Sequence, residues 1–154
     1  MKKIIVILSL FVFTNSICQT INERSTKIGL TNDELTDACK AYEKMIKSET
    51  YLESEKKVRE FAEKIENLII TQKIPFDSIN NREATLKLIK NNLEKTKFKT
   101  VAEAEKCINE MISSTERRKK ENENLYLLLS KSTPEQIMKI HKPFYDKTKA
   151  EYGY

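Results

Sequence analysis

Apolar residues recur at helical spacing along most of the chain after residue 30. The first such face carries Leu35, Ala38, Tyr42, Met45 and Ile46. This spacing predicts an amphipathic helix. Apolar positions from residue 58 onward fall about 140° round from that face, at about 100° per residue. We therefore expect a turn near residues 48–50 and a second helix to about residue 71. A single bent helix is the alternative, because no Gly or Pro marks the break.

Three segments have the spacing of a capping box, which starts a helix. They are Thr31 with Glu34, Thr50 with Glu53, and Thr100 with Glu103. In such a box the hydroxyl accepts a backbone amide of the first turn, and the carboxylate reaches back to the cap residue. We therefore expect a helix to begin at each of these three points.

Prolines mark the remaining boundaries. Pro75 lacks an amide and disfavours helical geometry at the residue before it, so a loop is expected there. A third helix should follow over residues 81–95. The last helix is expected to begin with Thr133 as its cap and Pro134 at its first position, where a missing amide costs nothing. Pro143 is expected to kink or end that helix.

Twelve residues, 113–124, contain no apolar side chain. Leu125 and Leu129 beyond this gap keep the heptad phase that Val101 and Ala104 set before it. A loop has no reason to keep that phase. We therefore expect one long amphipathic helix over residues 101–129, with a charged loop between two shorter helices as the alternative.

Polar residues occupy the seam of this helix inside the gap. They are tolerated there if that length projects past the bundle or pairs with another chain. A basic run lies beside them, for which a solvated helical face is the plainer interpretation. The candidate partner-binding residues are Thr115, Arg117, Arg118, Lys119, Lys120 and Asn122.

The pattern as a whole predicts an all-α protein, a four- to five-helix bundle with one long amphipathic helix. The 154 residues, 39% hydrophobic and 33% charged, fit one small domain. The two glycines, Gly29 and Gly153, are too few for phosphate-binding loops. Few turn-forming residues also argue against a β-sandwich or barrel.

The N-terminus has the organisation of a bacterial secretory signal peptide. A basic start is followed by a short apolar run over residues 4–13 and by a polar stretch with small residues before Gln19. We expect cleavage after Cys18; lipidation of Cys18 is the alternative. The run is too short for a membrane span, which takes about 20 apolar residues, and no later segment could span.

The expected organisation is therefore a signal peptide at 1–18, a flexible leader at 19–30 and a single helical domain at 31–154. The mature chain would be periplasmic or secreted. Cys39 and Cys107 would then lie in an oxidising compartment, where two thiols often pair. The alternative is that both are small buried apolar residues beside helical stripes.

The sequence offers little catalytic chemistry. His141 is the single histidine, and no cysteine pair at ligand spacing accompanies it, so neither a metal nor another cofactor is expected. Paired glutamates could serve a glycosidase or amidase, but one acid must then be buried. The pairs are Glu53 with Glu55, Glu60 with Glu63, and Glu121 with Glu123. We therefore expect a protein that is not an enzyme.

Two short segments resemble the Leu-Thr-x-x-Gln motif of the Spy-like periplasmic chaperones. Residues 30–34 lack its Gln, and residues 132–136 lack its Leu. The resemblance covers ten residues, and family membership is not inferred from it.

The leading hypothesis is an exported, non-enzymatic helical protein that binds a protein partner. It would act as a dedicated inhibitor or immunity protein, or as an envelope-assembly factor. Without residues 1–18 the formal net charge falls from +5 to +3, which is only mildly basic. Contact of the basic run with an acidic protein or an anionic envelope surface is the alternative to a solvated face, and nucleic acid is not an expected partner. A second copy of the chain is a further candidate partner. The alternative is a periplasmic, chaperone-like holder of unfolded clients, suggested by the basic charge and by Met45, Met111 and Met138.

Overall fold

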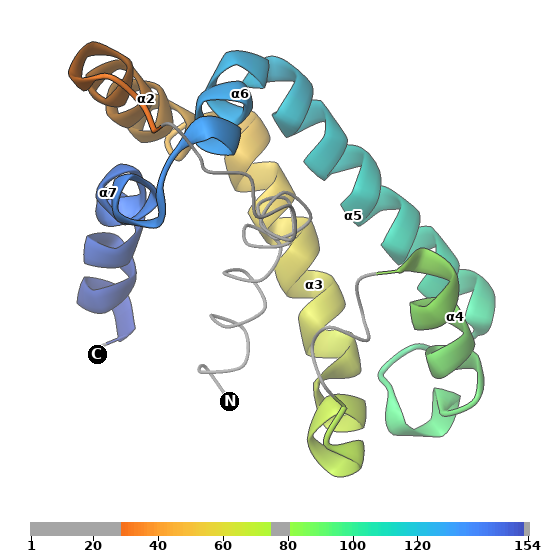
Figure 1. Cartoon of the computed structure of the whole chain (residues 1–154). Coiled ribbons are helices and arrows are strands. Elements are labelled where there is room, and N and C mark those ends of the chain that lie inside the picture. The colour runs from red at the N-terminus through yellow and green to blue at the C-terminus, as the bar shows by residue number, and fades with distance from the viewer. Residues whose placement is uncertain (1–28, 75–80, 153–154) are drawn as a thin grey trace. The chain divides into compact units, whose positions relative to one another are not determined.

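The computed structural model describes residues 29–74 and 81–152, and within them every regular element is helical (Figure 1). The elements in order are α2 (Asn32–Met45), α3 (Glu49–Gln72), α4 (Arg82–Lys90), the short 3₁₀ helix η2 (Leu93–Lys95), α5 (Val101–Glu121), α6 (Glu123–Lys131) and α7 (Pro134–Tyr152). The all-α class is confirmed. The described residues hold six α-helices where four or five were expected. The expected signal peptide, and the leader up to residue 28, lie outside the described residues.

The extra helix arises at Asn122, which separates α5 from α6. Its backbone has φ −121° and ψ 31°, outside helical geometry. Its side-chain amide donates to the carbonyl oxygen of Arg118 at 2.8 Å, and its backbone N–H donates to that of Lys119 at 3.1 Å. An asparagine side chain that bonds the backbone competes with the helical ladder. The expectation of one unbroken helix over residues 101–129 was therefore wrong, and so was the charged loop, because residues 113–121 are helical.

Hydroxyl groups cap α2 and α3, and the cap of α3 comes from a residue that was not expected. The capping box of Thr31 with Glu34 is present in both directions. At the start of α3, however, the hydroxyl that accepts the Tyr51 amide, at 3.2 Å, belongs to Ser48. The helix consequently begins at Glu49, and the expected cap at Thr50 was wrong.

The box at the start of α5 is shifted by one residue. The Glu103 amide donates to the hydroxyl of Thr100 at 3.1 Å, as expected. The Glu103 carboxylate accepts from the amide of Lys99 at 2.8 Å. Its other oxygen accepts from Lys64 of α3 at 2.5 Å, and these contacts lower the pKa of Glu103. The helix start is thus tied to a neighbouring helix.

The third and last predicted helices differ in length from expectation. Asn81 caps α4 by accepting two amides, but the helix ends at Lys90 and η2 follows. Helix α7 continues through Pro143 to Tyr152, so of the two outcomes expected at Pro143, a kink or an end, the helix does not end there. A proline inside a helix removes one hydrogen bond. Ile140 and Phe144, on either side of it, are buried, and their packing offsets the loss.

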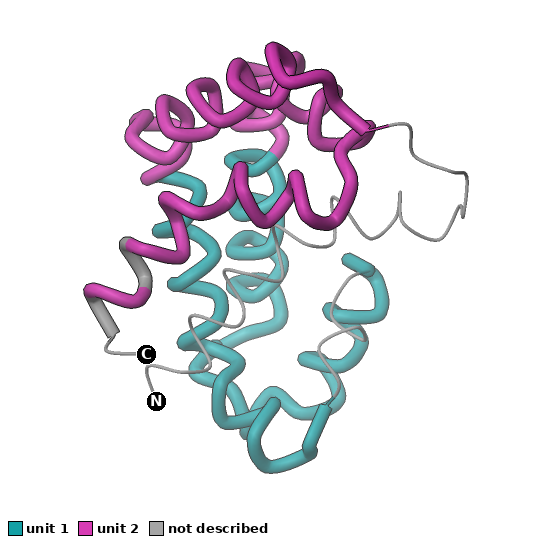
Figure 2. The backbone as a smooth tube through the Cα atoms, turned by 60° about the vertical axis from the view of Figure 1, so that its left-hand side comes forward, with its two compact units in different colours: residues 1–15, 53–115 teal, residues 16–52, 116–154 magenta. Residues whose placement is uncertain are grey.

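The described chain clusters into two compact units (Figure 2). Among the described residues, unit 1 comprises 53–74 and 81–115. Unit 2 comprises 29–52 and 116–152. Helices α3 and α5 each run from one unit into the other. The region that the sequence assigns to one domain thus contains two clusters of contacts.

Unit 1 has an apolar core built from α3, α4 and α5. Its buried members are Phe61, Ala62, Ile65, Leu68, Ile69, Ile89, Phe98, Ala104 and Ile108. The ammonium of Lys64 lies 5.0 Å from the centre of the Phe98 ring while it pairs with Glu103, so the edge of this core carries a cation–π contact.

In unit 2, α2 packs against α6 and α7. The predicted face of α2 is the buried one, with Ala38, Tyr42 and Met45 at 1% exposure or less. The ring of Tyr42 stacks on that of His141 from α7, with centroids 4.7 Å apart. His141 therefore packs in the core of unit 2.

Gln136 joins the end of the leader to α7. Its side chain accepts from the Leu30 amide at 2.9 Å, donates to the Leu30 carbonyl oxygen at 2.8 Å and accepts from the Thr133 amide at 3.1 Å. A Cβ at Gly29, whose φ is +80°, would come within 3.3 Å of Thr133 and Gln136. Order therefore begins before residue 31, and the two segments that resemble the chaperone motif contact each other.

Replacing Gln136 should destabilise the fold more than replacing an exposed glutamine. Gln136→Ala removes three hydrogen bonds at the start of α7, and we expect a loss of about 1–3 kcal/mol in the free energy of unfolding. Gln72→Ala, which removes one exposed bond to Asn92, should cost less than about 0.5 kcal/mol. Urea unfolding followed by circular dichroism measures both. Equal effects would contradict the role of Gln136.

His141 should make the fold sensitive to acid. Burial lowers its pKa from the ordinary 6.5 to about 4 in the folded chain. Between these values the unfolded chain binds the proton more readily, so stability is complete above about pH 6.5 and falls as the pH drops towards 4. The loss should reach roughly 3 kcal/mol at pH 4.

The comparison variant is His141→Phe, which keeps a ring against Tyr42 and removes the titrating group. Urea unfolding at pH 7, 5.5 and 4.5 should show a smaller loss of stability with acid for this variant than for the native chain. Identical pH dependence in the two proteins would show that another group is responsible.

Candidate functional site

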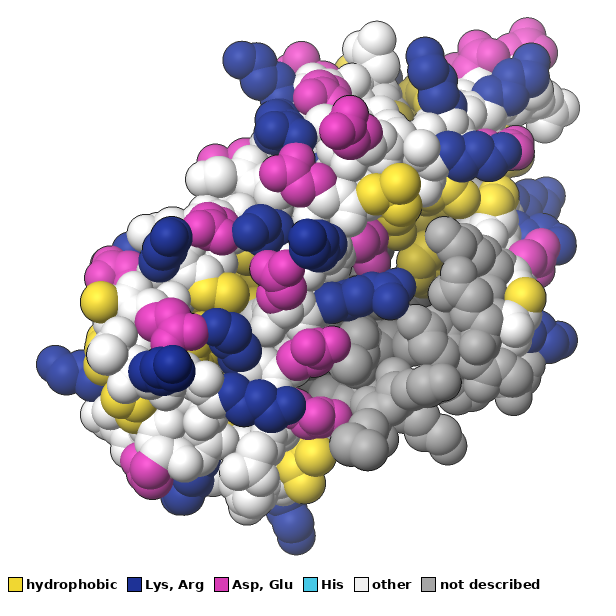
Figure 3. All heavy atoms as spheres, turned by 180° about the vertical axis from the view of Figure 1, so that it is seen from behind, with side chains coloured by type: hydrophobic (Ala, Val, Ile, Leu, Met, Phe, Trp, Pro, Cys, Tyr) yellow, Lys and Arg dark blue, Asp and Glu magenta, His cyan; other side chains and the backbone are white. Residues whose placement is uncertain are grey.

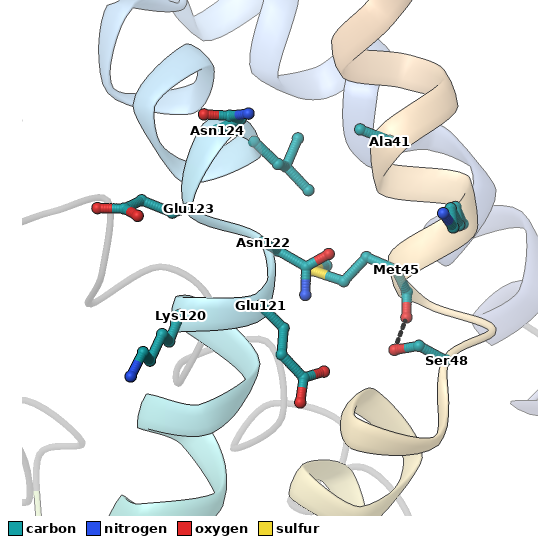
Figure 4. Close-up of a pocket in the computed structure, with 10 residues that line it drawn as sticks. Ala41, Met45, Ser48, Lys120, Glu121, Asn122, Glu123 and Asn124 are labelled. Atoms are coloured by element: carbon teal, nitrogen blue, oxygen red, sulfur yellow. Dashed lines mark hydrogen bonds between the residues drawn. The ribbon is translucent and has the colours of Figure 1, made fainter.

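A groove of about 520 Å³ lies in unit 2, between the C-terminal half of α2 and the break between α5 and α6 (Figure 4). One wall is formed by Ala41, Lys44, Met45 and Ser48, and the other by the six residues 120–125. The break at Asn122 turns the chain at this point, so the groove depends on the same residue that ends α5.

Two predicted apolar stripes meet beneath the groove, where their side chains are buried and offer it almost no surface. Met45 belongs to the buried face of α2, and Leu125 is the first apolar residue after the polar gap; they are 1% and 2% exposed. Ala41 adds a third apolar side chain. In Figure 4 the side chains of Met45 and Asn122 point toward each other across the groove.

Polar groups above these buried side chains come from both walls. The amide nitrogen of Asn122 donates to Arg118, which leaves its side-chain oxygen as an acceptor beside Met45. The hydroxyl of Ser48 donates to the Met45 carbonyl oxygen at 2.7 Å and so closes the end of α2. Ser48 therefore shapes the wall, while Asn122 offers an acceptor to the groove.

Charged side chains divide between the groove and its surroundings. Glu121 points across the groove toward the α2 wall, whereas Lys120 and Glu123 point away from it (Figure 4). Arg117 lies one turn before Glu121, with its Nε 3.9 Å from a carboxylate oxygen. The two groups form an ion pair, but 3.9 Å is too long for a hydrogen bond. The Glu121 carboxylate can therefore accept a hydrogen bond from another donor.

The predicted partner-binding residues separate into exposed and buried sets. Arg117, Lys119 and Lys120 are exposed, and of these three Lys120 lines the groove. Arg117 and Lys119 lie two positions apart on α5, about 200° round the helix. Thr115 is half-buried in unit 1, where its hydroxyl donates to the Met111 carbonyl oxygen at 2.9 Å. Asn122 is half-buried and lines the groove.

The side chain of Arg118 is fully buried, so a partner could not contact it directly. Its guanidinium carbon lies 5.7 Å from the centre of the Tyr51 ring, within cation–π distance. The heptad phase had placed residue 118 on the seam together with Leu125. The face of α5 that carries the heptad positions is therefore buried at residue 118, and Arg118 occupies a core position.

Sequence reasoning missed the α2 wall and Glu121. Met45 was assigned to the core by its spacing, and Glu121 was considered as half of a catalytic pair. No spacing within the sequence links residues 41–48 to residues 120–125, because their proximity arises from the packing of α2 against α6.

The glutamates of the three pairs differ in exposure and in ion pairing. Glu55 is buried, but its neighbour Glu53 lies two positions away on α3, about 200° round the helix. Glu60 is occupied by ion pairs with Lys56 and Lys57. Glu121 and Glu123 both line the groove, yet both are exposed, whereas a carboxylic acid of this chemistry needs a buried environment.

The described ranges give two further results. Among residues 29–74 and 81–152, no group of three or more His, Cys, Asp or Glu side chains is arranged to hold a metal ion. Within the same residues, no helix combines the length and the apolar composition that a membrane span requires.

Comparison of the chain with protein-family models, with curated proteins and with solved structures finds no match.

Cys39 and Cys107, the two cysteines among the residues that the structure describes, are free thiols, and both are half-buried. Cys39 lies on α2 in unit 2. Cys107 lies on α5 in unit 1, where it packs against the apolar core. Burial raises the pKa of the Cys107 thiol. Pairing of Cys39 with Cys107 stays a prediction.

Alkylation should detect the buried environment of Cys107. The thiolate is the reactive form, so a raised pKa slows reaction with iodoacetamide. In the native chain at pH 8 we expect Cys107 to be modified more slowly than it is in urea, as followed by peptide mass spectrometry. Equal rates would contradict its burial. A chain that is lighter by two hydrogens and reacts only after reduction would show pairing instead.

Proposed function

We propose that this chain is an exported, non-enzymatic helical protein that binds a protein partner through one surface of unit 2. We call this surface the α5–α6 surface; it consists of the groove and the exposed side chains of Arg117, Lys119 and Lys120. The mature protein is periplasmic or secreted. The partner is a target that it inhibits or neutralises, or a component of an envelope assembly.

The observation that carries this proposal is an exposed basic turn of α5 beside the groove of unit 2. The buried side chain of Arg118 fixes the phase of this turn, so its neighbours project from a rigid helix. Three adjacent cations also favour an acidic partner, by raising its rate of association.

A second candidate function, a chaperone-like holder of unfolded clients, has an observation of its own. Four large hydrophobic side chains in unit 2 are exposed: Leu52, Leu127, Met138 and Tyr145. Figure 3 shows hydrophobic side chains lying among basic and acidic ones over the face in view. Scattered apolar residues are normal on a protein surface, whereas unfolded clients need a contiguous apolar patch. We therefore rank this candidate second.

Site-specific photocrosslinking in the native host tests the proposal. A benzophenone side chain at Lys119 samples the α5–α6 surface, one at Met138 samples the exposed apolar residues, and one at Lys87 of α4 is the control. We expect one dominant adduct from Lys119 and none from Lys87. N-terminal sequencing of the recovered chain should begin at Gln19 if export removes residues 1–18.

Charge removal supplies the matched variant. With the benzophenone kept at position 119, replacing Arg117 and Lys120 together by Gln should reduce capture of the partner at least tenfold, with the helix content unchanged. A broad range of proteins captured from Met138, with nothing specific from Lys119, would favour the chaperone function. Absence of any adduct from Lys119 would overturn the proposed surface.

A further inference from the structure

We infer that the connection between α4 and α5, residues 90–100 of unit 1, binds the anionic headgroups of a phospholipid membrane (Figure 1). We call it the lysine surface; its cations are Lys90, Lys95, Lys97 and Lys99. None of these residues belongs to the α5–α6 surface, so the inference adds a second binding surface to the proposed function. It follows from how the connection is held, from its unpaired charge and from the side chains that it exposes.

Phe98 holds the middle of the connection. Its ring is 5% exposed and belongs to the apolar core of unit 1. The amide of Lys97 donates to the carbonyl oxygen of Lys64 in α3 at 2.8 Å. The side chains of Lys97 and Lys99, on either side of Phe98, are exposed. The buried ring therefore fixes the backbone from which two lysines reach solvent.

The first half of the connection is also bonded to its neighbours. The Asn67 side chain of α3 donates to the carbonyl oxygen of Lys95 at 3.3 Å. The Gln72 side chain donates to the side-chain oxygen of Asn92 at 2.5 Å, and the amide of Asn92 donates to the Leu88 carbonyl oxygen at 3.0 Å. The lysines thus project from an ordered backbone, and only their side chains need to be restrained when they bind.

The positive charge of the lysine surface is not neutralised by the rest of unit 1. Most other cations of this unit pair with a glutamate: Lys56, Lys57, Lys64, Arg82 and Lys106. Among the described residues, no carboxylate oxygen lies within 4.0 Å of the four ammonium groups of the lysine surface. Glu94 is the single acid in residues 90–100, which leaves a net charge of +3. Glu103, just beyond them, is occupied by Lys64 and by the Lys99 amide.

The exposed side chains favour a lipid surface over a protein. They are Lys90, Asn91, Glu94, Lys97, Lys99 and Thr100, all polar. Protein interfaces depend on aromatic and other apolar anchors and are depleted in lysine, and the one aromatic ring here is turned into the core. Lysine is a hydrated point charge, and clusters of about four or more cations are attracted to anionic lipid.

Nucleic acid is the other polyanion that four lysines would attract. Single strands are bound by stacking their bases on aromatic side chains, and Phe98 is buried. The choice of lipid over a duplex rests on the export that the proposed function includes, because an envelope protein meets anionic headgroups.

Vesicle sedimentation tests this inference on the chain as its host produces it. The probes are vesicles of phosphatidylcholine alone and vesicles of equal parts phosphatidylglycerol and phosphatidylcholine. At low salt we expect at least tenfold stronger binding to the anionic vesicles, at about a fivefold factor for each lysine that reaches the surface. Added salt should weaken this binding, because it screens the attraction.

Two triple variants remove the same charge from different places. The first replaces by Gln three exposed lysines of the lysine surface: Lys90, Lys97 and Lys99. The control replaces by Gln three exposed lysines of unit 2 outside the α5–α6 surface: Lys40, Lys139 and Lys149. The first should weaken binding to anionic vesicles at least tenfold, and the control should have a much smaller effect. Both keep the native N-terminus, so any lipid binding by the first residues is common to all three chains.

Acetylation of the native chain provides a measurement that needs no substitution. Acetic anhydride modifies lysines that solvent can reach. With anionic vesicles present, Lys97 and Lys99 should be modified more slowly than with neutral vesicles, whereas Lys40 and Lys149 should react at unchanged rates. Peptide mass spectrometry measures each site separately.

Equal binding to the two kinds of vesicle, equal losses from the two triple variants, or unchanged acetylation of Lys97 and Lys99 would each overturn the inference. Capture of a protein by a benzophenone at Lys97, without vesicle binding, would assign the surface to an acidic protein instead. Binding of duplex DNA without vesicle binding would assign it to nucleic acid.

These outcomes are distinct from failure of the proposed function. If the lipid inference alone is wrong, the crosslink from Lys119 to a partner still forms. If the partner-binding function is wrong, no Lys119 crosslink forms, while binding to anionic vesicles and its loss in the first triple variant are unchanged.

Discussion

Unit 2 depends on the buried side chain of Arg118 and its contact with the ring of Tyr51. Residues 113–124 offer no apolar side chain, yet the helix passing through them must present something to the core. Arg118 meets this need with its methylene stem and with its planar guanidinium beside the ring of Tyr51. Its burial keeps α5 in phase up to the point where Leu125 resumes the apolar seam. The same phase directs Arg117, Lys119 and Lys120 to solvent.

Asn122 then determines where helix α5 ends. Its side chain bonds back to the Arg118 carbonyl oxygen, and its backbone leaves helical geometry. Helix α6 therefore starts in a new direction while Leu125 still reaches the core. The space left beside Met45 is the groove. The core position at Arg118, the exposed cations and the groove are thus consequences of one polar stretch of sequence.

The spacing of apolar residues predicted which face of each helix is buried. It did not predict the contacts between helices. The face of α2 through Tyr42 and the resumption of the seam at Leu125 were correct, because spacing alone determines them. The predicted cap of α3 was wrong because Ser48 and Thr50 both carry a hydroxyl group near the start of the helix. The backbone conformation, which the sequence pattern does not give, brings the Ser48 hydroxyl to the Tyr51 amide. The groove was not predictable, since packing brings its two walls together from distant parts of the sequence.

Equilibrium unfolding of Arg118→Ala beside Arg117→Ala tests this account most directly. The two arginines are adjacent on α5, one buried and one exposed, so the pair separates a core role from a surface charge. The account predicts that Arg118→Ala lowers the free energy of unfolding by roughly 2–4 kcal/mol, through a lost stacking contact and a cavity. Arg117→Ala should cost less than about 0.5 kcal/mol. Equal, small effects from both substitutions would contradict a fold that depends on Arg118.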